Sequence, residues 1–141
     1  MPKLNIFALC EKVIMDEQKN PSLISLMENL DVDPREGKIP KNAVIAKEWA
    51  IFTQWQLSDD EQEKPFHQVI HAFWPDGTEF NKTIHSLPTQ QAEVKQINMA
   101  VVGLPIGQEG KITVKLWLEL ESKPVTETFF KTLKITHPPQ K

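Results

Sequence analysis

The feature that most constrains the fold is a strict alternation of apolar and polar side chains between Gly110 and Glu121. The alternating residues are Ile112, Val114, Leu116, Leu118 and Leu120 on one side, and Thr113, Lys115, Trp117, Glu119 and Glu121 on the other. A period of two is typical of a β-strand with one face on a hydrophobic core and one face in water. A short turn at 122–124 and a second β-rich run at 125–135 follow, so the region predicts a β-hairpin.

The rest of the chain reads as further strands that cover the apolar face of this hairpin. With the hairpin included, the predicted strands span residues 4–15, 22–30, 42–57, 66–74, 79–86, 94–104, 110–121 and 125–135. This spacing predicts an all-β fold, an immunoglobulin-like antiparallel β-sandwich of about eight strands. The chain has no tyrosine and one cysteine, so the tyrosine corner and the disulfide of antibody domains are excluded. We expect a single domain over residues 1–136 and a tail at 137–141.

Two of these strands carry specific expectations. The strand at 4–15 is apolar on both faces, so both faces should be covered for part of its length. The segment at 22–30 alternates imperfectly, and a helix capped by Ser22 is the alternative to a strand.

Three further details concern the other strands. The strand at 42–57 should bend at a bulge near Lys47 and Glu48. Phe80 and Ile84 share the inward face of their strand by parity. The core should include the tryptophans with apolar neighbours, which are Trp49, Trp55 and Trp74.

Composition excludes several classes of partner. The net charge is −3, with 16 basic and 19 acidic residues interspersed. We therefore expect no nucleic-acid and no membrane partner. Cys10 is the only cysteine, which favours a reducing, cytoplasmic location. The apolar run at 4–10 is short for a signal peptide, and no window approaches the ~18 residues of a membrane span.

Several segments together resemble a known family. They are Phe-Ala-Leu-Cys-Glu-Lys-Val-Ile at 7–14, Ser-Leu-Ile-Ser-Leu at 22–26, Pro-Asp-Gly at 75–77 and Leu-Pro-Ile-Gly-Gln-Glu-Gly at 104–110. The chain resembles a family of small bacterial proteins of unknown function, some of them encoded near mobile genetic elements. The resemblance implies a β-sandwich and brings no activity, cofactor or catalytic residue.

The histidines are the best candidates for metal ligands. His67 and His71 are four residues apart on a predicted strand, so they share a face but lie about 13 Å apart. His85, on the next strand, could approach one of them. Two histidines without a third ligand form a weak site, so we expect no metal.

No other pattern predicts catalysis or ion binding. The acidic segments Asp59–Glu63 and Asp31–Asp33 lack the alternating spacing of a calcium loop. Cys10 lies among apolar neighbours, where burial makes a thiol inert. We therefore predict no enzymatic activity and no cofactor.

Trp117 is the most informative single residue. By parity it lies with Lys115 and Glu119 on the wet face of the alternating strand, and an aromatic side chain on a polar face is a common binding anchor. The sequence therefore predicts a non-enzymatic interaction module that binds a protein partner or itself through Trp117, Lys115 and Glu119. The alternative is a module that binds a carbohydrate or small ligand.

Overall fold

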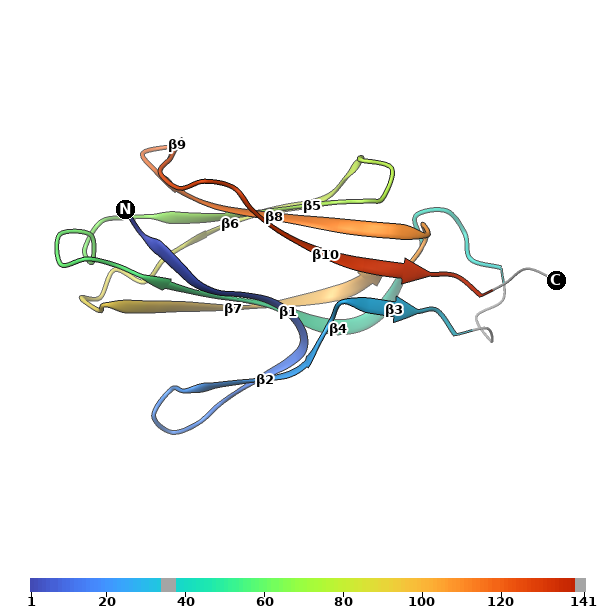
Figure 1. Cartoon of the computed structure of the whole chain (residues 1–141), viewed down its shortest axis with the longest axis horizontal. Helices are drawn as coiled ribbons and strands as arrows, with labels where there is room; N and C mark the ends of the chain where they lie inside the picture. Colours follow the sequence, from blue (N-terminus) through green and yellow to red (C-terminus); the bar gives the residue numbers. More distant parts are fainter. Residues whose placement is uncertain (34–37, 139–141) are drawn as a thin grey trace.

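The computed structural model of the chain describes residues 1–33 and 38–138, and within them it has ten strands and no helix. The strands form two sheets that pack face to face as a β-sandwich (Figure 1). All pairings are antiparallel except that of β3 with β10. The all-β sandwich expected from the sequence is therefore confirmed.

Sheet A has four strands and sheet B has six. In spatial order, sheet A contains β2 (Pro21–Leu26), β1 (Lys3–Met15), β4 (Val44–Gln56) and β7 (Val94–Pro105). Sheet B contains β3 (Asn29–Asp31), β10 (Phe129–Thr136), β8 (Gly110–Leu120), β5 (His67–Phe73) and β6 (Glu79–Ser86), while β9 (Lys123–Pro124) pairs with the end of β8.

The core lies between the inward faces of the two sheets. The alternation in β8 is observed as predicted, because its apolar residues Ile112, Val114, Leu116 and Leu118 are at most 1% exposed. The three tryptophans predicted for the core, Trp49, Trp55 and Trp74, are buried. The hairpin after β8 is confirmed by the antiparallel pairing of β8 with β10. Its turn and return strand differ from the prediction: positive φ at Glu121 and Ser122 reverses the chain, β9 follows at once, and β10 begins at Phe129 rather than at 125.

The segment predicted as one strand at 22–30 is two strands that belong to different sheets. β2 ends at Leu26 in sheet A, and β3 begins at Asn29 in sheet B. Ser25, the last residue but one of β2, has a φ of 55°, and Met27, between the two strands, is buried in the core. The single strand is therefore wrong, and so is its helical alternative, because the chain crosses from one sheet to the other here.

Two expectations about individual strands have different outcomes. The bulge near Lys47 and Glu48 is confirmed by a register shift between Ile45 and Glu48. The inward position of Ile84 is wrong: its side chain is 57% exposed, although Phe80 does pack against Trp74. The reason is a second register shift opposite Ala72 and Phe73, which places two residues of equal parity on opposite faces.

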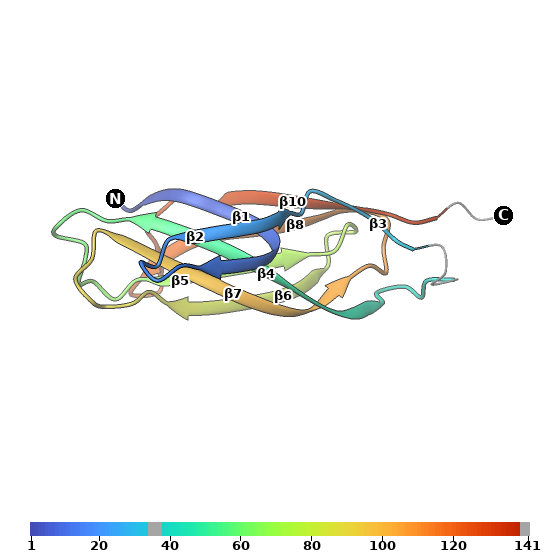
Figure 2. The same ribbon diagram turned by 90° about the horizontal axis from the view of Figure 1, so that it is seen from below.

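The β1–β2 hairpin folds over the outward face of sheet A. It curves beneath the sheet in Figure 1 and lies in front of it when seen from below (Figure 2). The backbone oxygen of Lys19 in its turn accepts a hydrogen bond from Gln96 Nε2 of β7, at 3.2 Å. Cys10 and Phe52 on this outward face are 0% exposed. The expectation that both faces of the first strand are covered is therefore confirmed at Cys10.

The remaining segments are connections and ends. His137, at the start of the predicted tail, is held by a 2.6 Å hydrogen bond between its Nε2 and the backbone oxygen of Ile106. The rest of that tail, 139–141, and positions 34–37 of the loop before β4 lie outside the described residues. No helix in the described part of the chain has the length and hydrophobicity that a membrane crossing needs.

Candidate functional site

The outward face of sheet B carries the three residues singled out from the sequence. Trp117, Lys115 and Glu119 all point outward from β8, because the residues between them point into the core. Directly paired neighbours on β5 extend the face: Val69 is opposite Trp117, and His71 is opposite Lys115. Side chains at such positions lie about 5 Å apart and interact.

Trp117 is half-buried and held in one orientation. Its Nε1 donates a hydrogen bond to Glu119 Oε2 at 2.9 Å. Its ring meets the ring of His71 edge-on, with centroids 6.5 Å apart. Val69, its direct neighbour, is 0% exposed although it points outward, so the surrounding side chains, Trp117 among them, cover it.

Lys115 lies over two aromatic rings. Its Nζ is 4.9 Å from the centroid of Phe73 and 5.7 Å from that of Phe130, both within the range of a cation–π interaction. The ring of His71 packs on Phe73 at 4.2 Å between centroids, and His71 Nε2 lies 2.9 Å from Glu79 Oε1. These contacts join strands β10, β8, β5 and β6 into one cluster.

We call this cluster the aromatic face. Its members are Val69, His71, Phe73, Ile84, Lys115, Trp117 and Phe130. Phe130 is 58% exposed and Ile84 is 57% exposed, so apolar surface meets water on both sides of Trp117. Sequence reasoning missed Phe73, Phe130 and Ile84, since their membership depends on which strands are neighbours and on the bulge in β6.

The three candidate histidines do not converge. His67 and His71 point outward, but His85 is opposite Gln68, a core residue. The suggestion that His85 could approach either of them is wrong, because adjacent residues on a strand point to opposite faces. Within the described residues, no group of three or more metal-binding side chains is present.

His85 instead belongs to a polar cluster inside the sandwich. Gln68 Oε1 accepts hydrogen bonds from Thr53 Oγ1 at 2.6 Å and from Trp55 Nε1 at 2.8 Å. Because an indole nitrogen can only donate, this orientation of the Gln68 amide is determined. Gln68 Nε2 and His85 Nδ1 are both buried without a partner in the structure. The cluster faces the core, so it is not open to a substrate.

The acidic segment Asp59–Glu63 is organised by its own hydrogen bonds. Glu61 is 6% exposed, and its Oε1 accepts hydrogen bonds from the backbone nitrogen and the hydroxyl of Ser58. Burial alone would raise the pKa of Glu61, but the N-terminal ammonium of Met1, 2.8 Å from Oε2, and the hydrogen bonds from Ser58 outweigh burial and lower it. The second hydrogen-bond acceptor of the Ser58 hydroxyl is Asp60. These carboxylates therefore stabilise the loop itself.

Two other titratable groups are buried. Burial raises the pKa of the Cys10 thiol, which agrees with the inert cysteine expected from the sequence. Burial also lowers the pKa of Lys95, whose Nζ donates to the backbone oxygen of Gln62. Lys95 points inward beside Trp55 from the edge strand β7. An inward-pointing charge is a common way to discourage pairing at a sheet edge.

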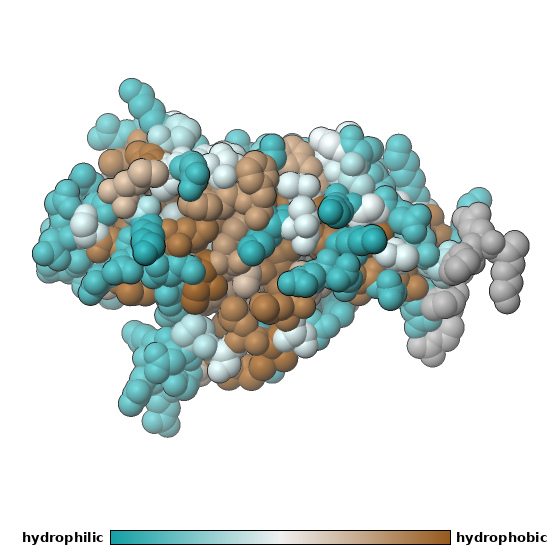
Figure 3. Space-filling view, viewed as in Figure 1, coloured by the Kyte–Doolittle hydropathy of each residue, from teal (hydrophilic) through white to brown (hydrophobic). Residues whose placement is uncertain are grey.

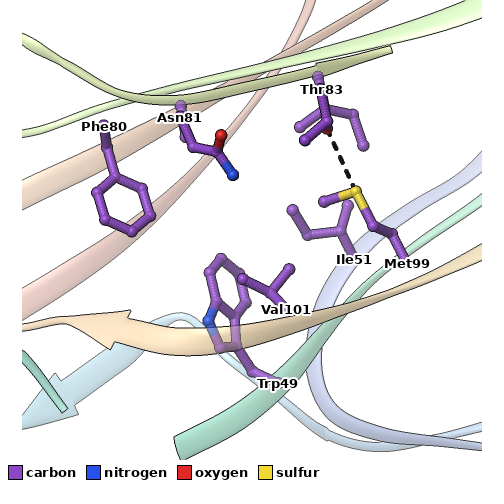
Figure 4. Close-up of a pocket in the computed structure, with 9 residues that line it drawn as sticks. Trp49, Ile51, Phe80, Asn81, Thr83, Met99 and Val101 are labelled. Carbon is purple, nitrogen blue, oxygen red and sulfur yellow. Dashed lines mark hydrogen bonds between the residues drawn. The ribbon is translucent and has the colours of Figure 1, made fainter. Parts of the chain in front are cut away.

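A narrow pocket, with room for about one water molecule, opens between the free edges of β6 and β7 (Figure 4). Trp49, Phe80 and Val101 line it, and Thr83 Oγ1 donates to Met99 Sδ at 3.4 Å across it. None of its lining residues is titratable. The pocket therefore has neither the room for a ligand nor groups for catalysis.

A second depression, of about 360 Å³, lies between β1 and β10 on the opposite side of the sandwich. Apolar surface runs down this side from the upper sheet to the β1–β2 hairpin (Figure 3). Phe7, Leu9 and Leu26 contribute to its lining, together with Lys131. It also lacks a nucleophile paired with a base, so the aromatic face remains the best candidate site.

Neither a protein-family model nor a curated protein gives a significant match to the chain. The resemblance to a bacterial family described above therefore stays a prediction. The function is inferred below from the chain's own residues.

Proposed function

We propose that the protein is a non-enzymatic interaction module that binds a protein partner, or a second copy of itself, through the aromatic face. The observation that carries this proposal is the apolar surface around Trp117, where Phe130 and Ile84 are each more than half exposed. Exposed aromatic and aliphatic side chains rimmed by charges are typical of the centre of a protein interface. The rim here consists of Lys82, Glu79 and Glu119.

The fixed geometry of the face supports binding. Trp117 is held by Glu119, and Phe73 is held between Lys115 and His71. Side chains that are already ordered lose little conformational entropy when a partner binds. A partner would therefore gain most of the free energy of burying Phe130 and Ile84.

Strand order supports an immunoglobulin-like assignment of the sandwich. β4 pairs with β7, as strand B does with strand E, and β10, β8 and β5 are neighbours in the order of strands G, F and C. The first strand, β1, pairs with β4 in sheet A, and β3 follows in sheet B, parallel to β10. The N-terminal segment is therefore divided between the two sheets. We place the protein in the cytoplasm, in keeping with its single, buried thiol.

The test uses substitutions that remove apolar surface without disturbing the core. Trp117→Ala is unsuitable, because it would uncover Val69 and lower stability. The double variant Phe130→Ser and Ile84→Ser changes only exposed side chains, and we expect it to unfold within about 1 kcal/mol of the parent in urea. Val102→Ser is the matched control, because Val102 is 75% exposed and points outward from sheet A.

The readouts are sedimentation velocity, for self-association, and cross-linking of the tagged protein in its host followed by mass spectrometry. The double variant should lose the dimer or the cross-linked partner at least tenfold, and Val102→Ser should retain it. Equal association by all three proteins would contradict the proposal. Specific binding on a glycan array that Phe130→Ser abolishes would favour the carbohydrate alternative.

A further inference from the structure

Lysine side chains gather on the outward face of sheet B. Lys111 of β8 is paired with Lys134 of β10. Four residues along β8, Lys115 is paired with His71 of β5, and Lys82 of β6 is paired with the other side of His71. Like charges at directly opposite positions destabilise a sheet. The Lys111–Lys134 pair therefore has a cost that a bound anionic group would offset, and Lys115 and Lys82 place two more cationic side chains on the same face.

The carboxylates of the same face are already engaged. On strands β10, β8, β5 and β6, the outward acidic residues are Glu79 and Glu119, and they bond to His71 and Trp117. The four lysines form no ion pair with any residue that the structure describes. The face thus has four lysines against two glutamates, although the whole chain has a net charge of −3.

The two basic rows have a defined spacing. Lys111 and Lys115 are four residues apart on one strand, which corresponds to about 13 Å. Thr113 lies between the rows and is paired with Thr132, and Phe130, two residues before Thr132 on the same face of β10, is 58% exposed. An extended segment with acidic residues at positions i and i+4 and an apolar residue at i+2 would match this order, since its alternate side chains have the same spacing.

Single-stranded nucleic acid is the other anionic ligand that such a surface suggests, but the rings are poorly placed for it. Base stacking needs a free ring face. The ring of Phe73 is covered by Lys115 and His71, Lys115 also lies over one face of Phe130, and Trp117 is half-buried against His71, so the face has no series of free rings for successive bases. Carboxylates and aliphatic or aromatic side chains of a protein fit this face better than bases and phosphates.

We propose that the aromatic face recognises an acidic protein segment in extended conformation, with carboxylates over the two lysine rows and an apolar side chain between them, against the exposed ring of Phe130. The inference rests on the proposed function and adds the chemistry of the partner. Salt should weaken such binding, because Lys82, Lys111 and Lys134 are exposed and the ion pairs form at the surface.

The probe is a fluorescein-labelled peptide with three repeats of Glu-Ser-Phe-Ser, and the comparison probe has Lys in place of each Glu. Binding to the full chain is followed by fluorescence anisotropy up to millimolar protein, and by amide chemical shifts. We expect the acidic peptide to bind at least tenfold more tightly than the basic one and to shift amides of β5, β8 and β10. Raising sodium chloride from 30 to 300 mM should weaken binding at least fivefold.

Charge-reversal variants test which lysines bind the acidic peptide. Lys115→Glu and Lys111→Glu should each weaken the acidic peptide at least fivefold, whereas Lys12→Glu, an exposed position on the β1–β2 hairpin, should not. Stronger binding of the basic peptide, tighter binding of oligo(U), or no binding of either peptide would overturn the inference. If the inference fails while the Phe130 and Ile84 variant still loses its partner, the proposed function stands with a partner of other chemistry. If that variant also keeps its partner, both fail.

Discussion

The outward faces of both sheets carry apolar side chains, but they differ in whether those side chains are shielded from water. On sheet A, Phe52 and Cys10 point away from the core and yet are 0% exposed, because the β1–β2 hairpin folds over them. On sheet B, Phe130 and Ile84 also point away from the core, and each is more than half exposed. The chain therefore covers one apolar outward face with its own hairpin and leaves the other open. This difference is the reason for assigning recognition to sheet B.

The hairpin itself shows the same division on its two sides. Val13 and Leu23 are directly paired and half-buried, whereas Ile14 and Ile24, on the opposite side, are exposed. We infer that the Val13 and Leu23 side faces Phe52. The outward face of sheet A is therefore a second, smaller core rather than a surface.

The largest expected effect comes from emptying this second core. Phe52→Ala should lower the free energy of unfolding by about 3–4 kcal/mol, because it leaves a cavity beneath the hairpin. Phe130→Ala on sheet B should lower it by less than about 1 kcal/mol, since most of that ring is already in water. Urea unfolding of the two variants measures both values. Similar losses would mean that the two outward faces are equivalent, and the comparison would fail.

A smaller effect is expected from a substitution in the β1–β2 hairpin, which weakens its packing but leaves Phe52 in place. Leu23→Ser should reduce the free energy of unfolding by about 1–2 kcal/mol and open a path to Cys10. Labelling of the Cys10 thiol by Ellman's reagent in the native protein should become at least tenfold faster. Ile24→Ser is the matched control, because Ile24 is on the exposed side of the same hairpin, and its labelling rate should equal that of the parent. Fast labelling of the parent would show that the hairpin does not seal this face.

The smallest effect is a pH dependence of the free energy of unfolding, which reports whether the hairpin keeps Cys10 out of water. Burial raises the pKa of Cys10 in the folded protein, whereas the unfolded thiol ionises near pH 8.5. Above that pH the folded state holds a proton that the unfolded state has lost, so stability should fall as pH rises through this window. The slope attributable to Cys10 is at most about 1.4 kcal/mol per pH unit. Cys10→Ala should lack this component in urea unfolding between pH 7 and 9.5, and parallel pH profiles would contradict a sealed thiol.

The sequence correctly predicted which side chains point inward and which point outward wherever the alternation of apolar and polar residues was unbroken. In β8 the period of two placed Trp117, Lys115 and Glu119 outward and their neighbours inward, because the pleat of a strand allows little else. It failed in two places where the backbone departs from a regular strand. Ser25, with its positive φ, divided one predicted strand between two sheets, and the bulge in β6 turned Ile84 outward. Neither departure has a local signal such as glycine or proline at the residue concerned.

The amino-acid sequence alone determined the fold class, the inward residues of β8 and the presence of an aromatic residue on its wet face. These properties depend on local periodicity, which each strand carries within itself. Only the tertiary structure decided which strands are neighbours, and hence that Phe73, Ile84 and Phe130 join Trp117, and that the β1–β2 hairpin covers sheet A but not sheet B. Strand order and register bring together residues far apart in the chain. The period-two pattern of one strand does not specify which other strand it pairs with.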